Sequence, residues 1–145
     1  MFKHDTIVRF SECDSLGHVN NSNYFTYFEE ARNDLFKIFN PSLKIESWNL
    51  IVASTQCDFI REVVYGQKLV VSTWISKIGN ASFQVEHVIQ DEHVIQDENQ
   101  NWIARGKVIL VHFNFQSQKS IPLSQEIRNV LSEHTEAPKG VPMLR

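Results

Sequence analysis

The sequence has few cysteines, no excess of basic residues and no long apolar run. Its only cysteines are Cys13 and Cys57, which form no C-x-x-C pair, so neither a disulfide framework nor a dithiol redox motif is expected. No apolar run approaches the roughly 18 residues that a membrane-spanning helix needs. The first twelve residues also lack the uninterrupted apolar core of a signal peptide. We therefore expect a cytoplasmic protein that does not bind membranes.

The charge balance argues against a nucleic-acid partner. Lys and Arg number 14 against 17 Asp and Glu, which gives a net charge of −3 and no basic field for a phosphate backbone. Apolar residues make up 42% and charged residues 21% of the chain, as in an ordinary globular protein. A length of 145 residues suits one core, so we expect a single domain over residues 1–145.

The stretch ECDSLGHVNNSNYFTYFEEAR, from Glu12 to Arg32, passes abruptly from small polar residues to aromatic ones. From Tyr24 to Phe39, apolar residues recur at helical spacing. This spacing predicts one continuous helix about 24 Å long, with Asn21, Ser22 or Asn23 as its N-cap. A helix that is apolar over so much of its circumference must be covered, and a sheet is the expected cover.

Strand patterns dominate the rest of the chain. The predicted strands cover 6–10, 50–64, 68–76, 82–89 and 102–111, with short turns between the later ones. Alternation places Phe83, Val85, His87 and Ile89 on one face of their strand and Val88 on the other. A short helix is expected over 124–131, and the tail from about residue 133 is expected to be loosely ordered. The fold class is therefore α+β, with one long helix packed in a curved antiparallel sheet.

The hexapeptide HVIQDE occurs twice in succession, at 87–92 and 93–98. An even insertion preserves strand alternation, so His87 and His93 would share a face if the strand continued. The partner strand at 102–113 has gained no matching residues, which favours a longer hairpin tip. No third ligand lies near these histidines in the sequence, so a metal site is not expected.

The order of elements, together with CDSLGHVNNSNYFTYFEEAR, resembles the hotdog-fold thioesterases of the 4-hydroxybenzoyl-CoA thioesterase-like family. The resemblance covers Thr6 to Ser132. It implies a hotdog fold, in which an antiparallel sheet of five to six strands wraps around one long central helix. It also implies hydrolysis of an acyl-CoA thioester, with neither a metal nor a cofactor.

Thioester hydrolysis needs a base or nucleophile and donors aimed at the developing oxyanion. The first turn of a helix offers free N–H groups and a partial positive charge, and Asp14 lies just upstream of that helix. The resemblance places the family's catalytic aspartate at Asp14 and its helix-start aromatic, whose backbone N–H faces the thioester oxygen, at Tyr24. Some relatives carry histidine where this chain has Asn21, which leaves Asn21 to hold a water or the carbonyl. His18 is expected either to orient Asp14 or to cap the loop.

Simpler structural roles compete with these catalytic ones. Asp14 before Gly17 is also typical of an Asx turn, while Asn20 and Asn23 suit turns and caps. Glu30 and Arg32 are expected to form a charge pair on the helix surface or at a subunit interface. Neither cysteine has an adjacent base, and Ser11 and Ser15 lack a G-x-S-x-G elbow, so other nucleophiles are not supported.

Coenzyme A would bring several phosphates to the surface of the protein. The candidate partners are Arg61, Lys77, Arg105, Lys107 and the turn from Gly79 to Ser82. The loop residues Gly17, Asn20 and Asn23 are candidates for the rest of the substrate. Acyl-carrier protein is the alternative thioester carrier. A hotdog hydratase or dehydratase and a non-catalytic acyl-binding subunit are the alternative functions.

A homodimer or a dimer of dimers (a homotetramer) is the expected assembly. A single sheet leaves an edge strand, and the strand over 82–89 has few lysines or prolines to block pairing. The resemblance implies sheets paired edge to edge, with the Asp14 loop facing residues 58–61 of the partner subunit.

Overall fold

A computed structural model describes residues 1–93 and 101–145. The strands are β1 (Phe2–Ile7), β2 (Leu50–Phe59), β3 (Lys68–Ile78), β4 (Ser82–Asp91), β5 (Trp102–Asn114) and β6 (Lys119–Ser120). The α-helices are α1 (Asn21–Ala31), α2 (Asn33–Phe39) and α3 (Gln125–Ser132), and short 3₁₀ turns cover Phe10–Glu12 and Ile45–Ser47. No helix within the described ranges has the length and apolarity needed to cross a membrane.

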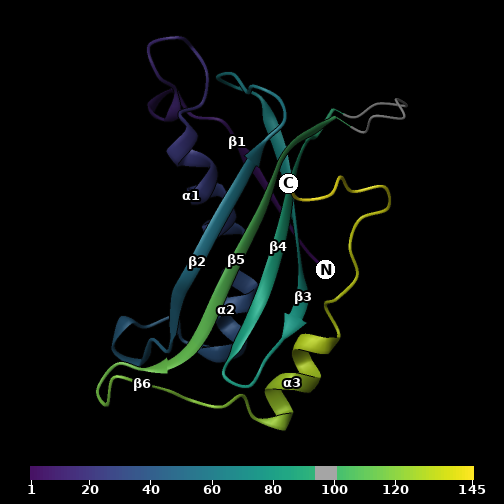
Figure 1. Cartoon of the computed structure of the whole chain (residues 1–145). Helices are drawn as coiled ribbons and strands as arrows, with labels where there is room; N and C mark the ends of the chain where they lie inside the picture. The colour runs from purple at the N-terminus through teal and green to yellow at the C-terminus, as the bar shows by residue number, and fades with distance from the viewer. Residues whose placement is uncertain (94–100) are drawn as a thin grey trace.

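The strands form one antiparallel sheet in the order β1-β3-β4-β5-β2, and the short β6 pairs with the end of β5. Helices α1 and α2 follow one another along one face of this sheet (Figure 1). The α+β prediction, with a sheet of five to six strands around a central helix, is therefore confirmed.

The core lies between the sheet and these two helices. As predicted from their alternation, Phe83, Val85, His87 and Ile89 are all buried. α1 approaches the sheet closely at Gly106, where an added Cβ would lie only 2.6 Å from the Phe28 ring. A glycine in the middle of β5 therefore lets the aromatic helix lie directly on the sheet.

The central helix is not continuous, in contrast to the prediction. Arg32, with φ −86° and ψ 4°, separates α1 from α2, and its side chain is buried rather than paired with Glu30 at the surface. Its Nη1 lies 3.1 Å from Nε2 of His87 on β4. The N-cap is Asn20, whose side chain accepts from the Ser22 N–H, and not one of the three residues that follow it.

The edge strands also differ from the prediction. The segment at 82–89 lies in β4 between β3 and β5, so it is central, and the two edges are β1 and β2. β2 ends at Phe59, and residues 60–64 belong to the connection that follows it. Most of β2 is exposed, including Ile51 and Val52.

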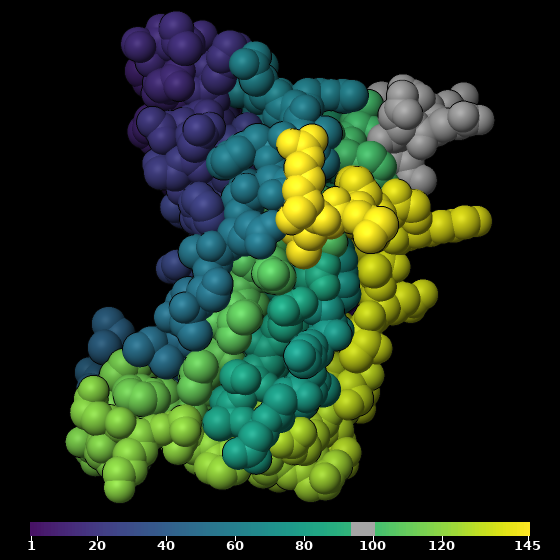
Figure 2. Space-filling view, viewed as in Figure 1, coloured from purple at the N-terminus to yellow at the C-terminus, as the bar shows by residue number. Residues whose placement is uncertain are grey.

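The segment after α3 crosses the face of the sheet opposite to the helices (Figure 2). We expected residues from about 133 to be loosely ordered. In the structure, the His134 carbonyl accepts from the Ile75 N–H at 2.8 Å and the Pro142 carbonyl accepts from Arg105 Nε at 2.6 Å. The Arg145 N–H donates to Asp58 Oδ2 at 2.7 Å. This C-terminal segment is therefore hydrogen-bonded to three strands.

The repeated hexapeptide spans the end of β4. β4 stops at Asp91 and β5 starts at Trp102, so His93 lies beyond the strand, in the connection between them. His87 is buried in the core, whereas His93 is exposed. Most of the second copy, and with it the prediction of a longer hairpin tip, lies outside the described residues.

Candidate active site

A pocket of about 460 Å³ opens where the Asp14 loop, the start of α1 and the segment after β2 meet. It is lined by Asp14, Leu16, His18, Val19, Asn21, Tyr24, Phe59, Ile60, Arg61 and Glu62. All four residues predicted to be catalytic are in this set. Phe59 to Glu62 of the same chain form one wall, and the expected contact of residues 58–61 with the loop of a partner subunit stays a prediction.

Asp14 holds the loop in a tight turn. Its Oδ1 accepts from the Leu16 N–H at 2.9 Å, and its backbone N–H donates to the His18 carbonyl at 2.8 Å. Gly17, at φ +82°, takes the left-handed conformation that glycine adopts without strain, and it donates to the Asp14 carbonyl at 3.0 Å. Asp14 is exposed, and among the described residues its Oδ2 makes no hydrogen bond, so the Asx turn leaves one carboxylate oxygen free.

The first turn of α1 is held by its cap. Asn20 accepts from the Ser22 N–H on its side chain at 3.0 Å and from the Asn23 N–H on its carbonyl at 2.9 Å. Asn23 Nδ2 donates to the Glu12 carbonyl, and Asn21 and Tyr24 line the pocket. Asn20 and Asn23 therefore have the capping and bracing roles considered for them, and Asn21 is the amide that reaches the pocket.

The ring of His18 contacts the opposite wall of the pocket rather than the Asp14 carboxylate. Its Nε2 lies 3.2 Å from Oε2 of Glu62, while the backbone of His18 pairs with Val64 as an isolated bridge. Arg61 also lines the pocket, and its Nη1 donates to Asn101 at 3.2 Å. The pocket therefore has carboxylates on two walls, from Asp14 and Glu62, and one guanidinium.

Burial keeps the neighbouring weak acids protonated. It raises the pKa of the Tyr24 phenol to about 12, with smaller contributions from the charges of Cys57 and Glu62. Burial, together with Asp58, also raises the pKa of the Cys57 thiol to about 12. Cys57 is therefore a neutral thiol at physiological pH and not an activated nucleophile.

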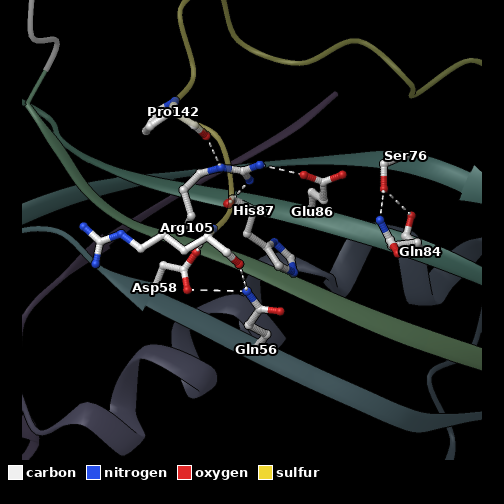
Figure 3. A network of polar contacts seen from close by, with 9 residues as sticks. Gln56, Asp58, Ser76, Gln84, Glu86, His87, Arg105 and Pro142 are labelled. Carbon is white, nitrogen blue, oxygen red and sulfur yellow. Dashed lines mark hydrogen bonds and ion pairs between the residues drawn. The ribbon is translucent and has the colours of Figure 1, made fainter.

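The remaining candidates for coenzyme A binding do not meet at this pocket. Lys77, Gly79 and Ser82 belong to the end of β3, the β3–β4 turn and the start of β4, at the opposite end of the sheet from the start of α1 (Figure 1). Arg105 is wrong as a phosphate ligand because it is buried and fully engaged. It donates to Glu86, to the His87 carbonyl and to the Pro142 carbonyl (Figure 3). Lys107 lies on β5 opposite Glu86 of β4, outside the pocket.

The second wall of the pocket was predicted only in part, as residues 58–61 of a partner subunit and as Arg61 in coenzyme A binding. Phe59 ends β2, and Ile60 and Glu62 follow it, about 45 residues from Asp14 in the chain. Their hydrophobic pattern indicated only a strand. Phe59 and Ile60 are 39% and 42% exposed. These exposed apolar side chains indicate a site only once the fold shows that they lie beside the Asp14 loop.

Comparison with known proteins gives the family. Residues 8–131 match the thioesterase-like superfamily. The chain belongs to this superfamily. The resemblance inferred from its loop and helix is thereby confirmed.

Relatives in bacteria cover most of the chain. A Bacillus subtilis (strain 168) relative of uncharacterized function, YsmA, is 31% identical over 124 residues, which are 86% of this chain and 80% of YsmA. The structure of a predicted thioesterase from Bacillus stearothermophilus is 32% identical with a TM-score of 0.86, over 94% of this chain and 98% of that one. A Thermus thermophilus thioesterase, crystallised with coenzyme A and Zn, is 28% identical with a TM-score of 0.75, over 88% and 94% of the two chains.

Proposed function

We propose that this protein hydrolyses acyl-CoA thioesters to a free carboxylic acid and coenzyme A, with Asp14 as the base or nucleophile. The observation that carries the proposal is that Asp14 and the first residues of α1 line one pocket in a member of the thioesterase-like superfamily. A carboxylate beside a helix N-terminus is the pairing that thioester hydrolysis requires.

Two routes are open to the Asp14 carboxylate. As a base it takes a proton from water, the resulting hydroxide attacks the thioester carbon, and the proton passes to the departing thiolate. As a nucleophile its oxygen displaces the thiolate to form an anhydride, which water then hydrolyses. Both routes use Oδ2, because Oδ1 holds the loop through the Leu16 N–H.

The oxyanion would develop at the start of α1. The partial positive charge of the helix N-terminus and the side-chain amide of Asn21 are the available electrophilic groups on this wall. We also propose that the Tyr24 backbone N–H faces the thioester oxygen, as the family resemblance implies. Because Asn20 already accepts from the Ser22 and Asn23 N–H groups, those two donors would serve mainly to hold the helix start in place.

Coenzyme A is the proposed thioester carrier. The Thermus thermophilus thioesterase crystallised with coenzyme A supports this choice over acyl-carrier protein. Arg61, as the guanidinium in the pocket wall, is the proposed contact for a phosphate or for the pantetheine arm.

A homodimer paired through β2 is the proposed assembly. β2 is an edge strand, and Ile51 and Val52 are exposed at 39% and 47%. An exposed edge with apolar side chains and no lysine is a template for pairing with a second copy. β2 thus replaces the strand over 82–89 in the assembly expected from sequence.

Release of free thiol from a panel of acyl-CoAs is the direct test. The panel should include short and long aliphatic chains and aromatic acyl groups, each also offered as a 2-enoyl-CoA and a 3-hydroxyacyl-CoA. We expect thiol release with at least one class. Conversion between enoyl and hydroxyacyl forms without thiol release would identify a hydratase, and tight binding without turnover would identify an acyl-binding subunit.

A further inference from the structure

Glu12 ends the 3₁₀ turn two residues before Asp14 and does not line the pocket. Four hydrogen bonds nevertheless converge on it. Its Oε1 accepts from the Tyr27 hydroxyl and from the Arg9 N–H, both at 2.8 Å. Its backbone carbonyl accepts from the Asn20 N–H at 2.9 Å and from Asn23 Nδ2 at 3.0 Å.

Two of these bonds reach well beyond the local turn. The bond from Arg9 closes the 3₁₀ turn and is a local feature of the backbone. Tyr27 and Asn23 lie on α1, 15 and 11 residues further along the chain. Glu12 therefore ties the 3₁₀ turn that enters the Asp14 loop to the first two turns of α1.

The bond to Tyr27 is well defined chemically. The Tyr27 side chain is completely buried, so its hydroxyl needs an acceptor within the protein. Burial, followed by the hydrogen bond to Glu12, raises the pKa of this phenol far above its usual range. The phenol therefore stays protonated and donates to Glu12 Oε1, which gives the bond a defined direction.

The other bonds of the loop do not fix it against the helix start. Asp14, Gly17 and His18 are bonded mainly to one another, which shapes the turn but not its distance from α1. The Val19 N–H donates to the Val63 carbonyl and anchors the far end of the loop to the segment after β2. The far end of the loop continues into α1 at the N-cap Asn20, and among the described residues Tyr27 and Asn23 are the α1 side chains that hydrogen-bond the Glu12 end.

We propose that Glu12 is a positioning residue that holds the Asp14 carboxylate in register with the N-terminus of α1. The inference rests on the proposed function, because it assigns Glu12 a role only through Asp14. It predicts that the oxygen acceptor at position 12 matters, and that its negative charge matters much less.

Steady-state kinetics of Glu12→Ala and Glu12→Gln on the best acyl-CoA substrate test the proposal. Glutamine keeps an oxygen that accepts from Tyr27 and Arg9, whereas alanine removes it. We expect Glu12→Ala to lower kcat by about 10- to 100-fold with little change in KM, since small misplacements of a reacting group are costly. Glu12→Gln should retain most of kcat, and Tyr27→Phe, which removes one donor, should fall between them.

Measuring the effect of Glu12→Ala in the Asp14→Asn variant separates positioning from general loss of structure. If Glu12 acts only through Asp14, adding Glu12→Ala to Asp14→Asn should not reduce the residual rate further. Ser124→Ala, which removes the cap of α3, is the control that lowers stability without lowering kcat. If Glu12→Ala does not fold, Tyr27→Phe takes its place. It should lower kcat in the wild type but should not lower the residual rate of Asp14→Asn further.

The outcomes that would overturn the proposal are distinct from failure of the proposed function. A wild-type kcat for Glu12→Ala, equal losses in both backgrounds, or an equal loss in the alanine and glutamine variants would each contradict the role of Glu12. Full activity of Asp14→Asn would instead contradict the proposed function itself.

Discussion

Arg32 Nη1 lies 3.1 Å from Nε2 of His87, and both side chains are buried between the helices and the sheet. Guanidinium only donates, so His87 accepts on Nε2 and carries its proton on Nδ1, from which it donates to the Thr73 hydroxyl at 2.8 Å. Burial lowers the pKa of Arg32 to about 10, so the guanidinium stays charged at neutral pH. His87 is therefore a neutral imidazole that bridges a buried cation and a hydroxyl.

This arrangement predicts loss of stability in mild acid. Burial, then the charges of Arg32 and Arg105, holds the pKa of His87 well below 6.5. Below about pH 6.5 the unfolded chain binds a proton at this histidine that the folded chain does not, so the free energy of unfolding falls as pH falls. The contribution of His87 is at most about 1.4 kcal/mol per pH unit.

Urea titrations between pH 7.5 and 5 measure this slope, and His87→Gln is the comparison variant. Lowered pKa values of His112 and His134 contribute slopes of the same sign, and that of Glu86 adds one only near the acid end, so the difference between the two proteins is the informative quantity. We expect a shallower slope in His87→Gln. An identical slope would show that His87 is not the buried neutral group.

Gly106→Ala should destabilise the core. The new Cβ would lie 2.6–2.9 Å from three atoms of the Phe28 ring, closer than packed carbons approach. We expect a loss of about 1–3 kcal/mol in the free energy of unfolding, measured by urea denaturation. Adding Phe28→Leu to Gly106→Ala should recover part of that loss, and strictly additive effects would contradict the direct clash.

Arg105→Met should destabilise more strongly. Arg105 Nη2 donates to Glu86 Oε1 at 2.6 Å, and the two side chains are only 5% and 15% exposed. Burial alone would raise the pKa of Glu86, but its bond with Arg105 brings it below the usual value. Removing the guanidinium leaves the partly buried Glu86 carboxylate without its cationic partner, with hydrogen bonds to Ser76 and Gln84 remaining, at a cost of up to about 3–5 kcal/mol.

The double variant Glu86→Gln/Arg105→Met is the control, since it removes the orphaned charge. It should be more stable than Arg105→Met alone. If Arg105→Met unfolds at the same urea concentration as the wild type, the network in Figure 3 contributes nothing to stability.

Local patterns in the sequence were enough to predict the fold class and half of the pocket. Asp14, His18, Asn21 and Tyr24 lie within eleven residues, so their proximity follows from a loop that enters a helix. The break at Arg32 could not be predicted, because the apolar spacing continues through it without proline or glycine. At the break, the Arg32 side chain contacts His87, 55 residues away, and no local pattern indicates this contact.

The order of the strands could not be predicted from the sequence pattern either, although one residue indicated the central position of β4. Val88 lies on the same face as Arg105, opposite to His87, and is completely buried. A strand that is apolar on both faces is typical of a central position. The same strand was nevertheless predicted to be an edge, because it lacks lysine and proline. That Phe59 and Glu62 line the pocket became clear only from the sheet topology.

Pairing through β2 predicts an assembly of at least two chains. Sedimentation at micromolar concentration should give at least twice the 16.9 kDa of the chain. Val52→Lys should shift it toward monomer, because a lysine on an exposed edge opposes pairing. A wild-type monomer that hydrolyses thioesters at full rate would contradict both the dimer and any contribution of a partner to the site.

Thiol release by Asp14→Asn tests the central claim most directly. Asparagine keeps the oxygen that accepts from the Leu16 N–H, so the turn should survive while the carboxylate chemistry is lost. Asp34→Asn, a surface carboxylate paired with Lys37 on α2, is the matched control and should behave as the wild type. We predict that Asp14→Asn loses about a hundredfold or more of the hydrolysis rate while its unfolding curve is unchanged. Near-normal turnover by folded Asp14→Asn would contradict the account.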